Sequence, residues 1–315
     1  MWRTAAPEEL PPGIRALNDA LWNIVSENGQ GAPAKKSSAL SYSGGMDSRF
    51  LAHAGQLLGY EVHLFMAVGP HVPPDEITAG QKWAKLRHMD IHCVEVDPLR
   101  LPLVVSNDRQ RCYACKREML SQIKKALRSV LNFPLPLCDG SNASDARKFR
   151  PGARAVREQG VLSPLALAGL EKADIYHLAR ASAMERPDQK PRPCMLTRLP
   201  YGVRAERKIL TDLAAAEQVV HNTLEKNALH EGDFRLRLIP DSNGGLVPQL
   251  HMLQDDMKLL PSAVRLQLST VTAEILGVSA IHIVPVETLS GYFDASDDQP
   301  YRGEDRQIWK VREAK

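Results

Sequence analysis

The chain has 315 residues, enough for two domains of ordinary size whose cores are stable without disulfide bonds. Its 40 Lys and Arg residues against 37 Asp and Glu leave a formal charge of +3, which excludes a general nucleic-acid coat protein. The composition, 43% hydrophobic and 24% charged, is that of a folded protein, and no apolar run approaches the roughly 20 residues that a bilayer span requires.

The first 35 residues carry charges and prolines where a signal peptide would need an uninterrupted apolar stretch. We therefore expect a cytoplasmic protein without a membrane anchor. Five cysteines are too few for a disulfide framework, and an odd number in a reducing compartment points to metal or redox chemistry.

The first predicted element is an amphipathic helix that precedes a polar break at residues 28–37. Its apolar residues recur at helical spacing: Ile14, Leu17, Leu21, Ile24 and Val25. From residue 38 onward, short apolar runs alternate with helical stretches. Strands are expected at 39–42, 62–68, 91–96 and 135–138, and helices from about 49, after 74, near 114–131 and near 172–183. This alternation predicts an α/β fold with a doubly wound, mostly parallel sheet covered on both faces, and ligands at the carboxyl ends of its strands.

The pattern changes after about residue 200, where a smaller α+β domain is expected. Its predicted elements are a helix at 209–229, strands at 234–239 and 245–252, a helix near 256–276 and a strand at 280–286.

A candidate phosphate-binding loop follows the first predicted strand of the sheet. The strand runs directly into Ser43-Gly44-Gly45-Met46-Asp47-Ser48 and then a helix. Two glycines let the backbone approach an anion closely, and the helix presents N–H groups with a partial positive charge. Ser43 and Ser48 add hydroxyl donors, and Asp47 is expected to hold Mg²⁺ or to orient a donor. The alternative is a Ser/Gly turn without a ligand.

The cysteines form the second candidate site. Cys112 and Cys115 are a C-x-x-C pair, and Cys194 follows far along the chain. Such a pair alone fits a redox couple, half of a zinc site or a packing accident, but structural zinc requires four ligands. Three thiolates suit a [4Fe-4S] cluster with one iron open to an exogenous sulfide. Cys93 and Cys138 lie in apolar strand contexts, so we expect both to be small buried hydrophobes.

Several segments in one collinear order carry a family resemblance over roughly residues 38–240. They are Ser43-Gly44-Gly45-x-Asp47-Ser48, Arg111-Cys112-Tyr113-Ala114-Cys115-Lys116, Asp139-Gly140-Ser141-Asn142-Ala143-Ser144-Asp145, Arg150-Pro151-Gly152, Ser163-Pro164-Leu165, Gly169-Leu170 with Lys172, Asp174 and Ile175, and Pro193-Cys194-Met195-Leu196-Thr197-Arg198 ahead of Pro200-Tyr201-Gly202. The first segment resembles the PP-loop ATP pyrophosphatase superfamily. The set together resembles the LarE-type ATP-dependent sulfur transferases within it.

The resemblance implies adenylation followed by sulfur transfer. Members of this family adenylate a carboxylate of pyridinium-3,5-biscarboxylic acid mononucleotide and convert it to a thiocarboxylate, a step in the biosynthesis of the nickel-pincer nucleotide cofactor. In one branch a single cysteine, equivalent to Cys194, gives up its own sulfur. In the other branch three cysteines hold a [4Fe-4S] cluster. Because Cys112, Cys115 and Cys194 are all present, we favour the cluster branch, with ATP, Mg²⁺ and the cluster as cofactors.

The resemblance also implies roles for individual residues. Ser43, Gly44, Gly45, Asp47 and Ser48 would bind ATP, and the catalytic residues would be Cys194, Lys116 and Asp47. Lys116 would offset phosphate charge or stabilise the leaving adenylate; its alternative is a solvated helix lysine.

The predicted substrate-binding residues are Ser141, Asn142, Asp145, Arg198, Arg235 and Arg237. The first three follow a strand end, although they are also residue types that cap a helix. Arg198 would bind a phosphate or carboxylate in bidentate fashion, and its alternative is a surface loop arginine.

Arg235 and Arg237 alternate with Phe234, Leu236 and Leu238, so strand geometry buries the apolar residues and points both guanidinium groups to one face. The alternative is a surface strand with two solvated arginines. The resemblance favours anion binding, because the family has a similar Arg-x-Arg element. The sequence departs from the family pattern at residues 239–244, which leaves the substrate's identity less defined than the chemistry.

Three other functions remain open on the sequence. A cluster-dependent tRNA-thiolating enzyme would need a surface for tRNA phosphates, and the sequence shows neither a zinc ribbon nor a strongly basic tail. An ammonia-using ligase would leave the three cysteines without a role. A non-enzymatic nucleotide sensor or structural zinc protein would bind ATP without turnover.

The predicted organisation has three parts: an N-terminal helical extension at 1–36, a PP-loop ATP pyrophosphatase domain at 37–200, and a C-terminal α+β domain for substrate binding or oligomerisation at 201–315. The expected partners are a small-molecule nucleotide substrate, a sulfide donor and further copies of the chain in a homo-oligomer, with no membrane and no nucleic acid.

Overall fold

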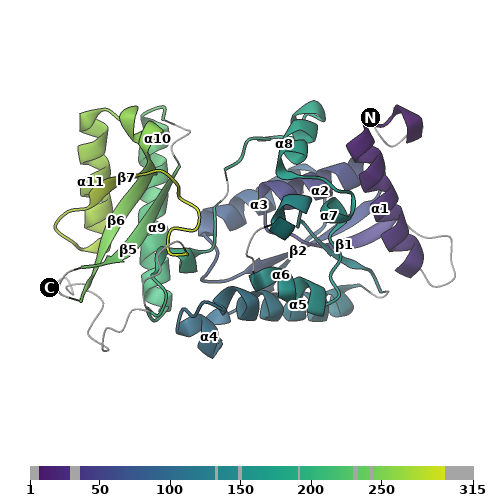
Figure 1. Cartoon of the computed structure of the whole chain (residues 1–315), viewed down its shortest axis with the longest axis horizontal. Coiled ribbons are helices and arrows are strands. Elements are labelled where there is room, and N and C mark those ends of the chain that lie inside the picture. The colour runs from purple at the N-terminus through teal and green to yellow at the C-terminus, as the bar shows by residue number, and fades with distance from the viewer. Residues whose placement is uncertain are drawn as a thin grey trace. The chain divides into compact units, whose positions relative to one another are not determined.

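A computed structural model of the chain describes residues 7–28, 36–131, 134–147, 151–190, 192–229, 233–241 and 244–294. The chain forms two compact units (Figure 1). The first unit consists of Met1–Gly69, Pro74–Pro98 and Cys112–Arg192, and the second consists of Pro70–Pro73, Leu99–Arg111 and Pro193–Lys315.

The first unit is built on a four-stranded parallel sheet with the order β3-β2-β1-β4. The strands are β1 (Ser37–Ser41), β2 (Glu61–Val68), β3 (Ile91–Glu95) and β4 (Leu137–Asp139). The helices of this unit are α1 (Pro12–Asn28), α2 (Met46–Leu57), α3 (Pro74–Leu86), α5 (Arg111–Val130), whose first residue is assigned to the second unit, α6 (Pro151–Glu158), α7 (Pro164–Leu167) and α8 (Lys172–Ala181). Parallel pairing requires these crossover helices, and the α/β prediction is confirmed.

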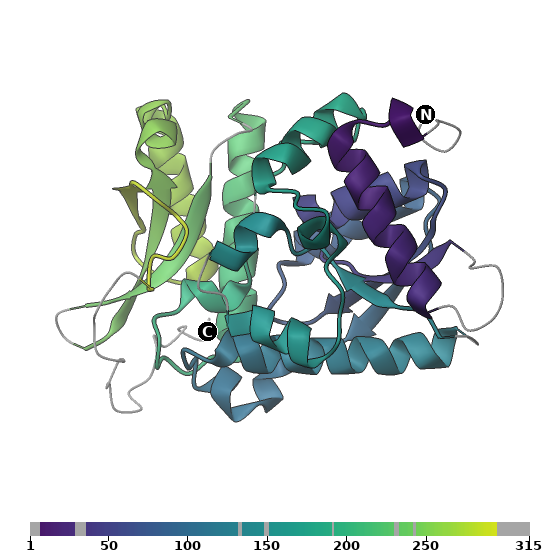
Figure 2. The same ribbon diagram turned by 45° about the vertical axis from the view of Figure 1, so that its right-hand side comes forward.

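Two apolar cores cover the two faces of this sheet. Leu40, Leu64 and Met66 pack on one face with residues of α1, α2, α3, α7 and α8. Their strand neighbours, among them Ala39 and Phe65, pack on the other face with α5 and α6. Successive strand residues point to opposite faces, so both sets are buried and the two faces of the sheet are both covered. Figure 2 shows α1 and α5 on opposite sides of the sheet.

The second unit contains a three-stranded mixed sheet with the order β5-β6-β7. Strand β5 (Phe234–Pro240) is antiparallel to β6 (Leu246–Leu253), which is parallel to β7 (His282–Val286). The remaining elements are α4 (Pro102–Val105), the 3₁₀ turn η4 (Met195–Arg198), α9 (Arg207–Lys226), α10 (Gln254–Lys258) and α11 (Ser262–Leu276). The predicted separate α+β region is therefore confirmed.

The prediction of one helix near 256–276 is wrong in one respect, because the structure has two helices in this region. Helix α10 ends at Lys258, and α11 begins at Ser262 after Pro261, which adopts an extended backbone at the N-cap. Proline has no N–H group and restricts the residue before it to extended conformations, so a continuous helix cannot pass through this position. Helix α11 ends at Gly277, whose left-handed conformation favours glycine.

None of the helices in the described ranges combines the length and apolar character needed to cross a bilayer.

Candidate functional site

The predicted phosphate loop joins β1 to α2 at the carboxyl end of the parallel sheet. Gly44 has a φ of +75°, a left-handed conformation that favours glycine. A Cβ atom on Gly44 would lie 3.3 Å from the Cα of Gly80 and 3.4 Å from the carbonyl oxygen of Glu76. The loop therefore requires glycine at this position both for its backbone conformation and for its close contact with α3.

Hydrogen bonds among its own residues hold the loop in shape. The Ser48 hydroxyl donates to the Gly45 carbonyl at 3.0 Å and lies 3.1 Å from the Ser43 hydroxyl, while the Ser43 N–H donates to the Ser48 oxygen at 3.3 Å. The N-cap of α2 is Gly45, which supplies no side-chain cap. The first N–H groups of α2 thus have no capping side chain, and this arrangement suits an anion.

Asp47 contacts a lysine to which the sequence analysis gave no role. The Lys172 Nζ atom donates to the Asp47 carboxylate at 2.7 Å, and the Lys172 backbone N–H donates to the Ser144 hydroxyl at 3.1 Å. Lys172 stands at the first position of α8 and so joins the phosphate loop to the turn after β4. Its only sequence signal is its place within a family-like segment.

The turn after β4 contains the other predicted residues of the first unit. The buried Asp139 carboxylate accepts hydrogen bonds from the Ser141 hydroxyl and the Ser163 hydroxyl, both at 2.7 Å. The Asn142 N–H donates to Asp145 at 3.3 Å, so Asp145 stabilises the turn as a capping residue would. The Asn142 side chain is buried, and its Oδ1 atom has no hydrogen-bond partner in the described part of the chain.

The turn after β4 and the phosphate loop are in direct contact. Parallel pairing places Ser41 opposite Asp139, so both loops leave the same edge of the sheet. A Cβ atom on Gly140 would lie 2.9 Å from the Ser48 nitrogen and 3.1 Å from the Ser48 Cα atom. The structure therefore brings Ser43, Gly44, Gly45, Asp47 and Ser48 together with the Asp139–Asp145 turn, as the sheet topology predicts.

Cys112 and Cys115 lie one helical turn apart near the start of α5, with Cys112 exposed and Cys115 buried. Positions three residues apart share a helix face, so both thiols can bind one metal centre. Thiolates near a helix N-terminus also gain from its partial positive charge. Lys116 follows on the same helix and is half-buried.

The two other cysteines of this unit differ from each other. Cys138 is buried as predicted, and burial together with the nearby Asp139 raises the pKa of its thiol to about 12. Cys93 is exposed, so the prediction of a buried Cys93 is wrong. It lies on β3, an edge strand of the sheet, where an apolar sequence context does not ensure cover on both faces.

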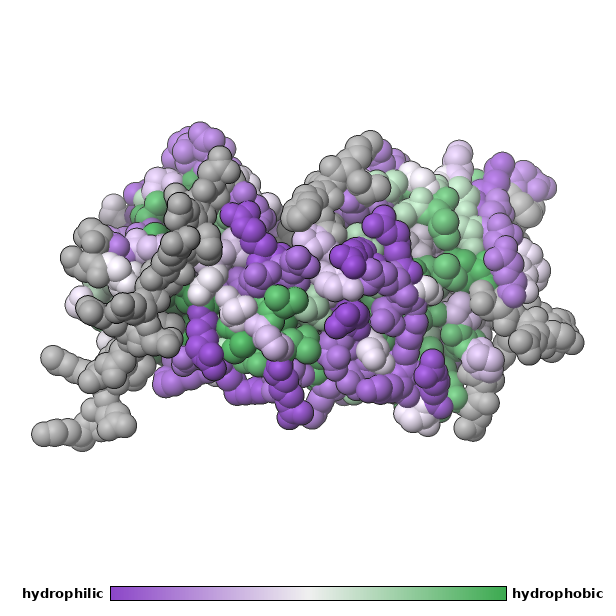
Figure 3. Space-filling model, turned by 60° about the horizontal axis from the view of Figure 1, so that its bottom comes forward, coloured by the Kyte–Doolittle hydropathy of each residue, from purple (hydrophilic) through white to green (hydrophobic). Residues whose placement is uncertain are grey.

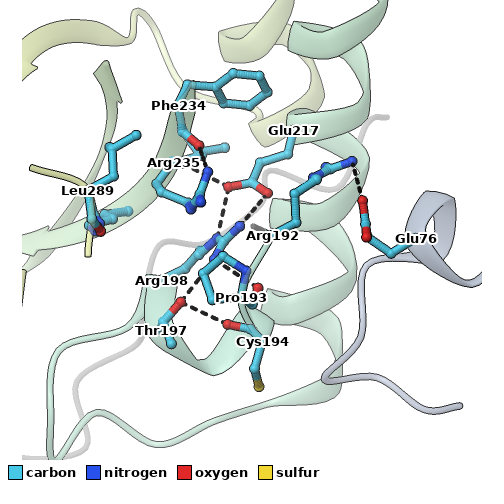
Figure 4. Close-up of polar contacts among 12 residues, drawn as sticks. Glu76, Arg192, Pro193, Cys194, Thr197, Arg198, Glu217, Phe234, Arg235 and Leu289 are labelled. Carbon is cyan, nitrogen blue, oxygen red and sulfur yellow. Dashed lines mark hydrogen bonds and ion pairs between the residues drawn. The ribbon is translucent and has the colours of Figure 1, made fainter. Parts of the chain in front are cut away.

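Cys194 lies at the N-cap of η4 in the second unit. Its carbonyl oxygen accepts hydrogen bonds from the Thr197 N–H at 3.0 Å and the Thr197 hydroxyl at 2.8 Å. The thiol points away from the Arg198 guanidinium in Figure 4. Cys112 and Cys115 belong to the first unit, and no group of three His, Cys, Asp or Glu residues forms a metal site within the described ranges. A cluster shared by all three cysteines stays a prediction.

Arg198 is fully buried and forms an ion pair with Glu217 of α9. Glu217 is not among the residues that the sequence predicts to be functional. Its Nε and Nη2 atoms each donate to a Glu217 oxygen at 2.8 Å, and its Nη1 atom donates to the Pro193 carbonyl at 3.1 Å (Figure 4). Glu217 also accepts the Leu236 N–H of β5 at 2.9 Å. Arg198 therefore ties the loop that carries Cys194 to α9 and β5.

Arg235 and Arg237 are both buried in β5, which removes the alternative of a solvated strand. Phe234, Leu236 and Leu238 are buried as well, as strand alternation predicts. Arg235 donates to Asp233 at 2.7 Å. Arg237 donates to the Nδ1 atom of His251 at 3.0 Å and to the Leu289 carbonyl, and its guanidinium lies 4.6 Å from the centre of the Tyr292 ring.

The three arginines lie close enough to repel one another. Burial, together with the charges of Arg198 and Arg235, lowers the pKa of Arg237 to about 10. Burial and the charge of Arg198 also lower the pKa of Arg235. His251 is kept neutral because burial and Arg237 lower its pKa to about 4. An anionic ligand would relieve this repulsion, so the cluster suits a phosphate or a carboxylate.

No family model matches the chain. An uncharacterized protein of Synechocystis sp. is 31% identical to this chain over 180 residues, which cover 56% of this chain and 66% of that protein. An uncharacterized protein of Methanocaldococcus jannaschii is 25% identical over 196 residues, covering 62% of this chain and 73% of that protein. The alignment thus spans slightly less than two thirds of the Synechocystis protein.

Replacing Gly140 with alanine tests the contact between the two loops. The added methyl group would lie within 3.2 Å of the backbone of Asp47 and Ser48, so we expect Gly140→Ala to displace the phosphate loop and to weaken at least about tenfold the MgATP-analogue binding that the sequence predicts. Calorimetric titration measures the affinity. The control is Gly152→Ala in α6, because Gly152 has no left-handed backbone and a Cβ there would come no closer than 3.7 Å to an atom outside its own helix. Equal affinities of the two variants for the MgATP analogue would contradict the conclusion that the close contact at Gly140 holds the phosphate loop in place.

The buried ion pair predicts a large loss of stability when one partner is removed. Glu217→Gln leaves the Arg198 charge buried without its carboxylate and should lower the free energy of unfolding by about 3–5 kcal/mol in urea titrations. Asp212→Asn on the same helix breaks an exposed pair with Lys208 and should cost less than about 1 kcal/mol. Adding Arg198→Met to Glu217→Gln should restore part of the loss, and a further loss would contradict the assignment.

His251 predicts a pH dependence of stability. Its pKa is lowered from 6.5 to about 4, so the unfolded chain binds more protons than the folded chain between these values. The free energy of unfolding should therefore decrease as the pH falls from about 6.5 to about 4. We expect His251→Gln to reduce this slope in urea titrations monitored by circular dichroism, whereas His282→Gln, at the exposed start of β7, should preserve it.

Proposed function

We propose that this chain is an ATP-dependent sulfur transferase that releases AMP and pyrophosphate. Its substrate is a carboxylate, in the first instance that of pyridinium-3,5-biscarboxylic acid mononucleotide, in nickel-pincer nucleotide cofactor biosynthesis. The observation that carries the proposal is the phosphate loop. A buried parallel strand, Gly44 in a left-handed conformation that favours glycine, and a helix N-terminus without a side-chain cap are together an arrangement that suits an anion.

The loop residues bind and activate ATP. The α2 N-terminus and the Ser43 and Ser48 hydroxyls bind the phosphates, while Asp47 holds Mg²⁺ or orients Lys172, whose ammonium group offsets the negative charge of departing pyrophosphate. The substrate carboxylate attacks the α-phosphorus, and the bond from this phosphorus to the bridging oxygen of pyrophosphate breaks. The carboxylate oxygen is then part of a good leaving group, AMP.

The cysteines supply the sulfur chemistry. Two thiols one turn apart on α5, with a third at the N-cap of η4, form a donor set that fits an iron–sulfur cluster better than a four-ligand zinc site. When bound, a [4Fe-4S] cluster would leave one iron open to an exogenous sulfide. Sulfide attack at the acyl carbon breaks its bond to the AMP oxygen and yields the thiocarboxylate. Lys116, next to Cys115, offsets the negative charge of the adenylate.

The arginine cluster of the second unit is the proposed site for the anionic part of the substrate. Arg235 and Arg237 are both buried, and burial together with the charge of Arg198 lowers the pKa of each, which supports an anion as the ligand of this cluster. The donors of Arg198 are already used by Glu217, Pro193 and Thr197, so its role is to support the Cys194 loop. The Asp139–Asp145 turn faces the phosphate loop and contributes Ser141 and Asn142 to substrate binding.

One observation favours tRNA as an alternative substrate. The C-x-x-C pair stands on α5, a helix rich in basic residues, including the exposed Arg117, Lys125 and Arg128. Figure 3 views the molecule from the side of α5, where hydrophilic surface surrounds smaller apolar patches. A nucleic-acid substrate would produce an affinity that falls steeply with salt concentration.

The proposal is tested by removing one cysteine. The protein is prepared anaerobically, reconstituted with iron and sulfide, and assayed with the pyridinium dicarboxylate mononucleotide. We expect Cys112→Ala to lower thiocarboxylate formation at least about 100-fold while pyrophosphate release stays within about threefold. The control is Cys93→Ala, which removes an exposed thiol that has no part in the proposal.

Each other outcome has a defined meaning. Formation of one thiocarboxylate per chain by Cys112→Ala, with loss of one H₂S from Cys194 and no iron, would establish the sacrificial route. Pyrophosphate release that depends on tRNA instead of the small carboxylate would establish the alternative substrate. Absence of pyrophosphate release with every substrate would contradict an adenylating enzyme.

A further inference from the structure

The segment that leads from α8 to Cys194 is attached at several points to α2 and α3 of the first unit. We call this segment, residues 182–190 and Arg192, the strap. It begins at the end of α8, where the Ser182 hydroxyl lies 3.0 Å from the Nε2 atom of His53 in α2. All of its attachments described below lie within the first unit.

Arg49 makes the central attachment of the strap. It follows Ser48 directly in the first turn of α2, and its side chain is buried. Its Nη1 atom donates to the Glu185 carbonyl and its Nη2 atom to the Arg186 carbonyl, both at 3.0 Å. Burial lowers the pKa of Arg49. A buried guanidinium held by two backbone carbonyls fixes the path of the chain at that point.

The Glu185 side chain continues this attachment onto α3. Its carboxylate accepts hydrogen bonds from Trp83 Nε1 at 3.1 Å and from Arg87 Nη2 at 3.0 Å. The Trp83 ring also lies close to both guanidinium groups, 5.8 Å from Arg49 and 5.6 Å from Arg87. Arg49, Trp83 and Arg87 therefore form one network that holds Glu185.

The far end of the strap is bound at the N-terminus of α3. Gln189 donates to Glu76 at 3.2 Å, and Arg192 pairs with Asp75 and, at 3.8 Å, with Glu76 (Figure 4). Cys194 is two residues beyond Arg192, and two residues span at most about 7 Å. The attachment of Arg192 thus limits how far the Cys194 backbone can move from α3.

The segment from α8 through the strap is connected to the first turn of α2 at two points, one at the start of α8 and one in the middle of the strap. Lys172, at the start of α8, binds Asp47, and Arg49 binds the strap carbonyls after α8. Asp47 and Arg49 flank Ser48, a residue of the phosphate loop. A shift of this helical turn when phosphate binds would therefore move the strap, which leads to Cys194.

We propose that Arg49 is a positioning residue that links the phosphate loop to the strap and so holds Cys194 in place for sulfur transfer. This inference deepens the proposed function and rests on it. Arg49 does not act on ATP directly in this proposal, because its side chain is buried and its guanidinium donates to two carbonyl groups of the strap. Its removal should affect the sulfur step more than the adenylation step.

The variants Arg49→Met and Arg49→Lys test the link. Methionine keeps much of the side-chain volume and removes all donors, whereas lysine keeps the charge and can satisfy one carbonyl. Arg180→Met is the control, because Arg180 makes an exposed ion pair with Asp188 of the same strap. Glu185→Ala removes the carboxylate that binds the strap to α3. Because this carboxylate is half-exposed, the variant tests the same link with little risk to folding.

The activity measurement separates the two half-reactions. With the pyridinium dicarboxylate mononucleotide, we expect Arg49→Met to lower thiocarboxylate formed per pyrophosphate released by about tenfold or more, with the KM for ATP within about twofold of that of the unaltered chain. Arg49→Lys should recover part of this ratio, Glu185→Ala should lower it to a smaller extent, and Arg180→Met should leave it unchanged. An unchanged ratio in Arg49→Met would overturn the inference.

A second measurement does not depend on turnover. Hydrogen exchange of strap peptides and alkylation of Cys194, both read by mass spectrometry, should be about fivefold faster in Arg49→Met and Glu185→Ala than in Arg180→Met. Equal rates in all variants would overturn the inference even if the enzyme is active. If the unaltered chain forms no thiocarboxylate but these rates differ, the proposed function fails and the attachment of the strap by Arg49 stands.

Discussion

The parallel pairing of β1 with β4 is the constraint on which the rest of the first unit depends. Because Ser41 lies opposite Asp139, the phosphate loop and the turn after β4 leave the same edge of the sheet and touch through Gly140. Lys172 then binds both loops, one through its ammonium group and the other through its backbone N–H. A parallel sheet thus places the glycine loop after β1 and the polar side chains after β4 next to each other, although they are far apart in sequence.

Buried arginine is the corresponding feature of the second unit. Arg198 is neutralised by Glu217, whose carboxylate also accepts an N–H group of β5. Arg235 and Arg237 are also buried, and burial together with the charge of Arg198 lowers the pKa of both. Like charges that lie close together lower the stability of the fold. Proteins keep such arrangements at sites where a ligand of opposite charge binds.

The strap connects these chemical features along the chain. It starts where α8 ends, is fixed to α2 by Arg49 and to α3 by Glu185 and Arg192, and reaches Cys194 two residues later. The same first turn of α2 contacts ATP in the proposed function and the strap in the structure. The proposed nucleotide site and Cys194 are therefore connected through a short series of polar contacts and the chain that follows them.

Local sequence patterns determined the strands, most helices, the glycine loop after β1 and the pairing of Cys112 with Cys115 on one helix face, because each depends on neighbours within a few residues. Other features depended on the tertiary structure: the contact of Lys172 with Asp47, the ion pair of Arg198 with Glu217, the burial of Arg235 and Arg237, and the exposure of Cys93. Lys172 and Asp47 are 125 residues apart, and Cys93 is exposed only because β3 is an edge strand. Periodicity and residue type report the local backbone, whereas burial and ion pairing are set by which distant elements pack together.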